Sequence, residues 1–328
     1  MNTSAPDVLG SPVPVLSYGP VVLSVPGRPV DLQVRVTAPA EGTGLPVILL
    51  SHGHGSSHHL SSLHGYAPLA ERWARLGFVV VQPTHLSSAT LSGTVADEPG
   101  APLFWRSRAQ DMSYVLDRLD TIERTVPLLA GRVDREHVAV AGHSLGGFTA
   151  ALLLGARATE TGAGAAPDLR DPRITQGVLL AAPGRGGDVL NGWMADRVPF
   201  LHTVDFSGMT TPALVVAGDK DDSRHFTDVG PDWHADPYRL APGPKTLLTL
   251  FEAEHGLGGI AGHDAEETTD ENPARVAALA RLTAAYLRTA FGIDDEAWPA
   301  ARAELATGTH AFGTVETKPA EPGVRPSA

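Results

Sequence analysis

The chain has 328 residues, no cysteine and a formal net charge of −12 at pH 7. The absence of cysteine excludes disulfides, a thiolate nucleophile and a cysteine metal site. The acidic balance argues against nucleic acid and anionic membrane surfaces as partners. No stretch has the roughly 20 apolar residues of a membrane-spanning helix, and the N-terminus lacks the basic and apolar regions of a signal peptide. We therefore expect a cytoplasmic protein without an integral membrane segment. The sequence does not indicate its oligomeric state.

The chain divides into three predicted regions. Residues 1–20 contain prolines and no sustained hydrophobic period, which predicts a loose leader. Residues 21–298 are long enough for one large domain, within which the irregular segment 183–209 is expected to form a lid-like insertion. Residues 299–328 are polar and rich in proline, which predicts a frayed tail.

Buried strands alternate with amphipathic helices along residues 21–298. Residues 30–36 alternate apolar and polar side chains, as a half-buried antiparallel strand does. Continuous apolar runs, typical of strands covered on both faces, occur at 46–50, 78–81, 138–141, 177–182, 213–217 and 246–251. Helical spacing occurs at 66–76, 104–122 and 272–287. This order predicts an α/β protein with a mostly parallel central sheet, helices on both faces and an antiparallel N-terminal strand.

The sequence 142–147, Gly-His-Ser-Leu-Gly-Gly, stands between a predicted strand and a predicted helix. A strand, a sharp turn and a helix place Ser144 at an apex, in a strained backbone conformation with its hydroxyl above the edge of the sheet. The following helix directs its N-terminal N–H groups at the space over Ser144. The pattern indicates a nucleophilic serine, which needs a base to take its proton.

His255 is the predicted base, because it follows the last apolar run inside a Gly-containing loop. A serine, acid and histidine in that chain order is the arrangement expected after such a turn. His143 is adjacent to the serine, with a side chain expected to point away from it. His263 lies in an acidic stretch that is expected to be solvated.

A carboxylate is needed to orient His255 and to stabilise its cationic form. Three aspartates follow the run 213–217, and Asp221 is favoured because it lies deep enough in the turn to reach His255. Asp219 and Asp222 are the alternatives there, and Asp188 would be the acid if it came one strand earlier. The acidic run could also be a plain solvated turn.

The oxyanion of a tetrahedral intermediate needs two N–H donors. The backbone N–H of Leu145 is one expected donor, and that of His54, in the Gly-rich loop after the run 46–50, is the other. The same loop could instead bind a transition metal through imidazoles. The histidines concerned are His52, His54, His58 and His59. No carboxylate accompanies them, so we predict neither a metal site nor a cofactor.

These clusters give the chain a resemblance to serine α/β-hydrolases over residues 30–290. The resemblance is carried by residues 51–55 (Ser-His-Gly-His-Gly), 142–147, 218–221 (Gly-Asp-Lys-Asp) and 254–256 (Glu-His-Gly). Within that superfamily the chain is most similar to the dienelactone-hydrolase, chlorophyllase and platelet-activating-factor acetylhydrolase-like esterases. The resemblance implies the α/β-hydrolase fold and a serine esterase of the carboxylesterase type, acting on a small-molecule ester.

Large apolar residues in irregular segments suggest an acyl or alcohol pocket beside the site. The candidates are Trp105, Trp193, Met194 and Phe206, with Phe200. Few basic residues accompany them, so a neutral, fairly apolar ester is the expected substrate. Two alternatives stay open. The same residues could act on an amide, a thioester or a polyester, or the fold could be a non-catalytic binding protein.

Overall fold

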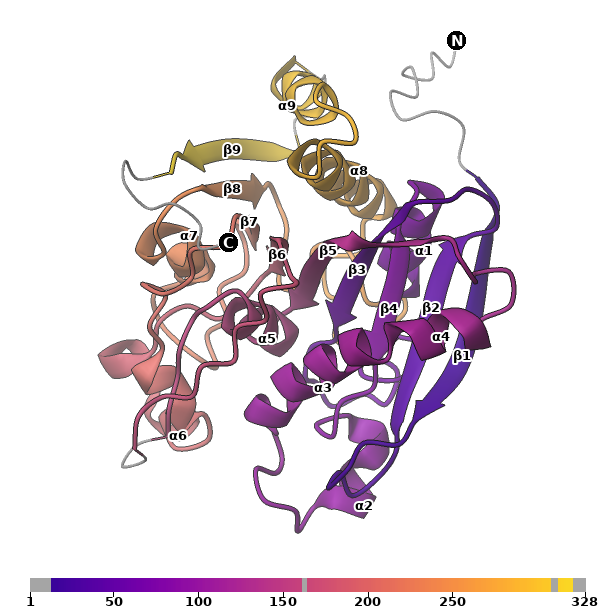
Figure 1. The fold of residues 1–328 in the computed structure, drawn as a ribbon. Coiled ribbons are helices and arrows are strands. Elements are labelled where there is room, and N and C mark those ends of the chain that lie inside the picture. The colour runs from indigo at the N-terminus through magenta and orange to yellow at the C-terminus, as the bar shows by residue number, and fades with distance from the viewer. Residues whose placement is uncertain (1–12, 161–163, 308–311, 321–328) are drawn as a thin grey trace.

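The computed structural model describes residues 13–160, 164–307 and 312–320. In these ranges the strands form one nine-stranded sheet in the order β1-β2-β4-β3-β5-β6-β7-β8-β9 (Figure 1). The strands are β1 (Val15–Leu23), β2 (Leu32–Pro39), β3 (Leu45–Ser51), β4 (Val79–Pro83), β5 (Val133–His143), β6 (Gln176–Leu180), β7 (Ala213–Gly218), β8 (Lys245–Leu250) and β9 (Gly313–Lys318).

The sheet is mostly parallel. Strands β4, β3, β5, β6, β7 and β8 are joined by parallel pairings, whereas β2 pairs antiparallel with β4, and β1 with β2. The predicted mostly parallel sheet with an antiparallel strand at its start is confirmed. The carboxyl ends of the six parallel strands lie at one edge, where open α/β sheets bind ligands.

Helices cover both faces of the sheet. They are α1 (Ala67–Arg75), α2 (Ser92–Val95), α3 (Trp105–Asp117), α4 (Leu119–Thr125), α5 (Leu145–Leu153), α6 (Gly192–Ala195), α7 (Asp236–Leu240), α8 (Pro273–Ala290) and α9 (Ala297–Thr307). Single 3₁₀ turns are η1 (Ala89–Leu91), η2 (Gly187–Val189), η3 (Pro199–Thr203) and η4 (Pro231–Ala235). The predicted helix 104–122 is two helices, α3 and α4, which meet at Arg118.

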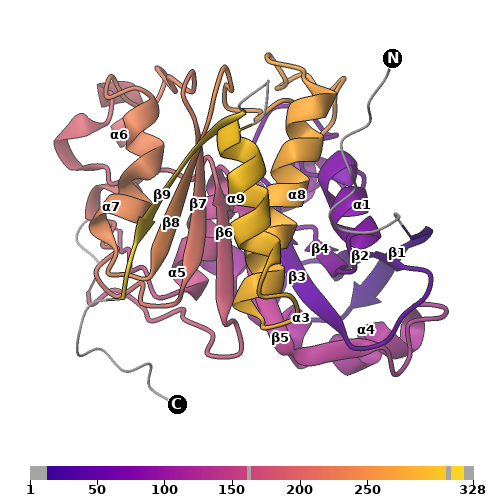
Figure 2. The same cartoon turned by 90° about the horizontal axis from the view of Figure 1, so that it is seen from above.

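The core consists of two apolar clusters, one on each side of the sheet. In β3, Val47 and Leu49 pack into the cluster of α3, α4 and α5, whereas Ile48 and Leu50 pack into that of α1, α8 and α9. This alternation follows from the two-residue period of a strand. Both sets of side chains are buried, so the strand sequence is apolar throughout. Figure 2 shows α8 and α9 side by side over one face.

The N-terminal leader predicted at 1–20 differs from the structure. β1 begins at Val15 and pairs antiparallel with β2, with a register shift between Tyr18 and Val21. Gly19 and Pro20 interrupt the alternation at that irregularity, which hides the strand from a reading of the period. Residues 1–12 lie outside the described ranges.

The C-terminal tail predicted at 299–328 also differs from the structure. Its first part continues α9, and residues 313–318 form β9, an edge strand paired antiparallel with β8. An edge strand is held by backbone hydrogen bonds and needs little apolar character, so β9, with the sequence Gly-Thr-Val-Glu-Thr-Lys, reads as a polar tail. Residues 308–311 and 321–328 are not among those described.

The segment 183–209 connects β6 to β7 through η2, α6 and η3. Its side chains Phe200, Phe206 and Met209 are buried in the same apolar cluster as α5. A backbone bridge between Arg157 and Asp205 also ties it to the chain that follows α5. The segment is thus packed onto the domain, and its action as a lid stays a prediction. Within the described ranges, every helix is too short or too polar to cross a bilayer.

Candidate active site

Ser144 stands at the turn between β5 and α5 in a backbone conformation that side chains rarely adopt. Its φ is 54° and its ψ is −121°, and such strain concentrates at functional sites. The turn requires glycine on both sides of Ser144, because backbone atoms lie where a Cβ would be. A Cβ at Gly142 would lie 2.0 Å from the carbonyl oxygen of Gly146, and one at Gly146 would lie 2.1 Å from that of Ser51.

The structure brings Ser144, His255 and Asp221 together from the ends of β5, β8 and β7. Oγ of Ser144 lies 2.9 Å from Nε2 of His255, and Nδ1 of His255 lies 2.7 Å from Oδ2 of Asp221. A carboxylate only accepts hydrogen bonds, so Nδ1 donates to Asp221 and Nε2 is left to accept from the serine hydroxyl. This arrangement can move a proton from the hydroxyl to the imidazole while the carboxylate holds the ring.

Asp221 is the most deeply buried of the three, with 1% of its side chain exposed against 36% for His255. Burial alone would raise the pKa of its carboxyl group. The neighbouring His255 and His234 outweigh that effect and hold the pKa of Asp221 well below its usual range. The hydroxyl of Ser223 adds a hydrogen bond of 2.8 Å to Oδ1. Asp221 is therefore an ionised carboxylate with partners on both oxygens.

His234, in η4, is a second imidazole on this carboxylate, and no motif in the sequence marks it. Its Nε2 lies 3.2 Å from Oδ2 of Asp221 and 3.0 Å from Oγ of Ser223. Its Nδ1 lies 2.9 Å from the carbonyl oxygen of Ala182, which can only accept. Nδ1 therefore donates to that carbonyl oxygen, and Nε2 lies between the carboxylate and the hydroxyl of Ser223. The buried ring of His234 thus connects Asp221 to the backbone just after the end of β6.

The two predicted oxyanion donors have backbone N–H groups without a hydrogen-bond acceptor among the described residues, at His54 in the loop after β3 and at Leu145 in the first turn of α5. His54, His143, Ser144 and His255 all line one small cavity of about 40 Å³, which also contacts Gly256, Glu267 and Thr268. Free N–H groups at a helix start beside a serine hydroxyl can stabilise a negatively charged oxygen.

A buried hydrogen-bond chain runs beneath the serine and joins the His54 loop to the His255 loop. The N–H of Gly53 donates to Oη of Tyr66 over 2.9 Å, and Tyr66 lies 2.7 Å from Nδ1 of His143. Nε2 of His143 donates over 2.7 Å to the carbonyl oxygen of His255. The hydroxyl of Tyr66 therefore donates to His143. Among the described residues the ring of His143 makes its hydrogen bonds to Tyr66 and to the backbone of the predicted base, and none to Oγ of Ser144.

A second Ser–His–Asp chain lies inside the domain. Oγ of Ser51 is 3.0 Å from Nε2 of His85, whose Nδ1 is 3.0 Å from Oδ2 of Asp111. All three residues are buried, and Arg108 donates to Ser51 and to the carbonyl oxygen of His52. No cavity described in the structure contacts this chain. Its place under the loop that carries His54 makes it a structural support.

The other predicted acids are placed apart from His255. Asp222 is ion-paired with Arg224 at 2.8 Å, and Asp188 is exposed in η2. Asp219 lies at the end of β7, where its backbone N–H donates to the carbonyl oxygen of Leu250. Neither these three nor His263 makes a hydrogen bond to His255 or Ser144 within the described residues.

The loop histidines proposed as an alternative metal site do not converge. His52 uses both ring nitrogens, toward the carbonyl oxygen of Gly53 and the N–H of His85. His54 contacts the carbonyl oxygen of Ser87 at 3.3 Å. The one cluster with the ligand types of a metal site in the described ranges is Asp221, His234 and His255. Its atoms are already engaged in the hydrogen bonds described above.

The aromatic residues predicted to line a pocket are placed in the core. The ring of Trp105 stacks on Phe200 at 5.5 Å between centroids, and Met194 and Phe206 are buried in the same apolar cluster. None of these four side chains contacts either described cavity, because all four are packed into the apolar cluster that also contains residues of α3 and α5. The side chain of Trp193 lies outside the described part of the structure.

No model of a protein family matches the sequence, and no curated protein matches it. The fold is similar to a solved structure, the monoclinic form of an esterase from Pyrobaculum calidifontis, with a TM-score of 0.55 and 19% sequence identity. The match covers 86% of this chain and 87% of that esterase. At this identity the similarity concerns the fold alone. Together with the strand order and the serine turn, it identifies the α/β-hydrolase fold.

Proposed function

We propose that this chain is a serine-dependent hydrolase that cleaves a neutral, fairly apolar carboxylic ester through an acyl-enzyme. The observation that supports this most directly is the hydrogen-bonded chain from Ser144 through His255 to Asp221. It stands beside two backbone N–H groups, of His54 and Leu145, that have no acceptor among the described residues. Neither cavity at this edge is lined by a described Lys or Arg, which favours a neutral substrate over an anionic one.

The first half of the reaction forms the acyl-enzyme. Oγ of Ser144 attacks the ester carbonyl carbon while Nε2 of His255 takes the hydroxyl proton. The carbonyl oxygen becomes an oxyanion, held by the N–H groups of His54 and Leu145. When the intermediate collapses, the C–O bond to the alcohol breaks, and Nε2 of His255 gives its proton to the departing oxygen.

The second half hydrolyses the acyl-enzyme by the same route. A water molecule replaces the alcohol, His255 takes its proton, and the hydroxide adds to the acyl carbon. Collapse releases the carboxylic acid, and the proton returns from His255 to Oγ of Ser144. Asp221 stays ionised throughout and stabilises the imidazolium that forms in each half.

The experiment combines labelling and turnover. Wild-type protein should be labelled covalently by a fluorophosphonate probe and should hydrolyse p-nitrophenyl acetate. Ser144→Ala should lose both properties and keep its circular dichroism spectrum, because Ser144 packs little side chain. Labelling that persists in Ser144→Ala would refute the nucleophile. Labelling of the wild type without ester hydrolysis would favour an amide, a thioester or a polyester, and no labelling would favour a binding protein.

A further inference from the structure

A second, wider cavity of about 460 Å³ adjoins the small one that holds Ser144. Its volume is in the range of small-molecule pockets, about 300–1,000 Å³. His54 is the residue that lines both cavities, and the wider one is otherwise built from the loop after His54 and from the chain between β4 and α3. Its remaining lining residues are Gly55, Ser56, His58, Leu86, Ser87, Ser88, Ala89, Ser92, Val95, Ala96, Ala101, Pro102 and Phe104.

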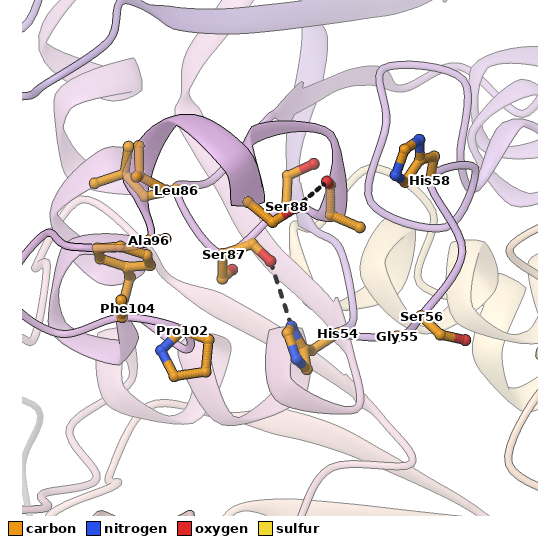
Figure 3. Close-up of a pocket in the computed structure, with 14 residues that line it drawn as sticks. His54, Gly55, Ser56, His58, Leu86, Ser87, Ser88, Ala96, Pro102 and Phe104 are labelled. Atoms are coloured by element: carbon orange, nitrogen blue, oxygen red, sulfur yellow. Dashed lines mark hydrogen bonds between the residues drawn. The ribbon is translucent and has the colours of Figure 1, made fainter.

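The wide cavity has a polar end beside His54 and an apolar end away from it. Figure 3 shows Leu86, Ala96, Pro102 and Phe104 gathered at one end, while the His54 loop forms the other. His54 is held in place there by its contact of 3.3 Å with the carbonyl oxygen of Ser87. No Lys, Arg, Asp or Glu is among the described lining residues. This lining fits a ligand that is uncharged and has an apolar end.

The position of the proton donor decides which part of an ester enters the wide cavity. His255 protonates the departing alcohol, so the alcohol lies on the His255 side, where the small cavity continues to Gly256 and Thr268. The acyl carbonyl oxygen faces the N–H of His54. The wide cavity includes His54 and excludes His255, so it lies on the acyl side.

We propose that the wide cavity is the acyl subsite and that it selects uncharged acyl chains of medium length with an apolar end. This inference rests on the proposed function. Each methylene that leaves water for the apolar end should raise kcat/KM by up to about fourfold, until the cavity is filled. The alcohol part of the ester should have no such effect, because it lies on the other side of the scissile bond.

Ala96→Trp tests the proposal by filling the apolar end. Ala96 follows α2, is exposed and has helical backbone angles, so the larger side chain is compatible with the fold. Thr94→Trp is the matched control, because Thr94 is exposed in α2 and does not line the cavity. The substrates are p-nitrophenyl esters from acetyl to octanoyl, and acetate esters of alcohols from ethanol to hexanol.

In the wild type and in Thr94→Trp, kcat/KM should rise from acetyl to hexanoyl. In Ala96→Trp the hexanoyl ester should lose at least tenfold, and the acetyl ester should stay within about twofold. Equal losses on acetyl and hexanoyl esters, or no loss on either, would overturn the acyl subsite. A dependence of kcat/KM on alcohol length that differs between Ala96→Trp and the wild type would also overturn it. If the wild type is not labelled by fluorophosphonate and hydrolyses no ester, the proposed function fails instead.

Discussion

Asp221 is shared between two histidines: its Oδ2 lies 2.7 Å from Nδ1 of His255 and 3.2 Å from Nε2 of His234. One histidine is partly exposed beside Ser144, and the other is buried with 1% of its side chain exposed. The buried ring of His234 helps to hold the carboxylate of Asp221 in place, because it is itself held by Ser223 and by the carbonyl oxygen of Ala182.

Replacing His234 with glutamine should lower the rate. The imidazole contacts Asp221 through one nitrogen and the carbonyl oxygen of Ala182 through the other, and the flexible glutamine side chain holds these contacts less firmly. We expect kcat/KM on p-nitrophenyl acetate to fall about tenfold or more, because Asp221 then orients His255 less precisely.

Ser223→Ala is the control for this prediction, because it removes hydrogen bonds to Asp221 and His234 and leaves the imidazole in place. It should lower kcat/KM less than His234→Gln does. If His234→Gln keeps the kcat/KM of the wild type, or loses no more than Ser223→Ala, the ring of His234 does not position Asp221.

Substitution of the aspartates by asparagine tests which carboxylate orients His255. Asp221→Asn keeps the shape and loses the charge, and the Ser–His–Asp protease used as the general example of this change loses about 10⁴ in kcat. Asp219→Asn and Asp222→Asn should lower kcat only mildly. Asp188→Asn should leave kcat nearly unchanged and should change the free energy of unfolding by no more than about 0.5 kcal/mol. The measurement is kcat on folded protein, verified by circular dichroism. A dead Asp188→Asn would move the acid to the preceding strand.

The strands of the sheet could be predicted from the sequence because burial on both faces leaves a continuous apolar run, as at 46–50 and 213–217. The two edge strands could not. β1 is broken by Gly19 and Pro20, and β9 exposes most of its side chains. An edge strand depends on backbone pairing with a neighbour far along the chain, as β9 does with β8, and no local period records that pairing.

The residues that directly follow the parallel strands could be predicted from the sequence to lie close together, because the topology brings those strand ends to one edge. The residues that hold them in position could not be predicted. His234 contacts Asp221 from η4, and Tyr66 contacts His143 from the start of α1. Both residues lie well beyond the end of the strand that comes before them, β7 and β3. Large apolar residues in irregular segments predict an aromatic pocket beside the site, whereas Trp105 and Phe206 fill the core. Apolar character by itself does not separate a core residue from a pocket residue.

Tyr66→Phe should disturb the loops of His54 and His255 together. The change leaves the buried N–H of Gly53 and Nδ1 of His143 without partners, and each unsatisfied group costs about 1–3 kcal/mol. We expect the free energy of unfolding to fall by about 2–4 kcal/mol. We expect kcat to fall at least tenfold with little change in KM, because the positions of the oxyanion donor and the base shift.

Tyr286→Phe is the matched control, since Tyr286 is a mostly buried tyrosine in α8 whose ring packs on Trp298 in α9. Urea unfolding and steady-state kinetics are measured on both variants. If Tyr66→Phe behaves like Tyr286→Phe in kcat, the buried chain does not position the two loops.

Acidification should destabilise the protein through His143. Burial, reinforced by the neighbouring His255, lowers the pKa of His143 to about 3, whereas an unfolded chain has a histidine pKa of about 6.5. Between these values the unfolded state binds a proton that the folded state does not. The free energy of unfolding therefore falls as the pH drops from about 6.5 to about 3, by at most about 1.4 kcal/mol per pH unit for this one group.

His143→Gln isolates that contribution, because glutamine does not titrate and its amide can still donate to the carbonyl oxygen of His255. The free energy of unfolding in urea is measured at pH 7, 6, 5 and 4 for the wild type, His143→Gln and the exposed control His64→Gln. Buried His52 and His85, whose pKa values burial also lowers, keep some slope in every variant. We expect His143→Gln to lose stability more slowly than the wild type below pH 6, with His64→Gln parallel to the wild type. Equal slopes in all three would mean that His143 takes up its proton in the folded state, and the chain from Tyr66 to His255 would then carry a charge under the serine.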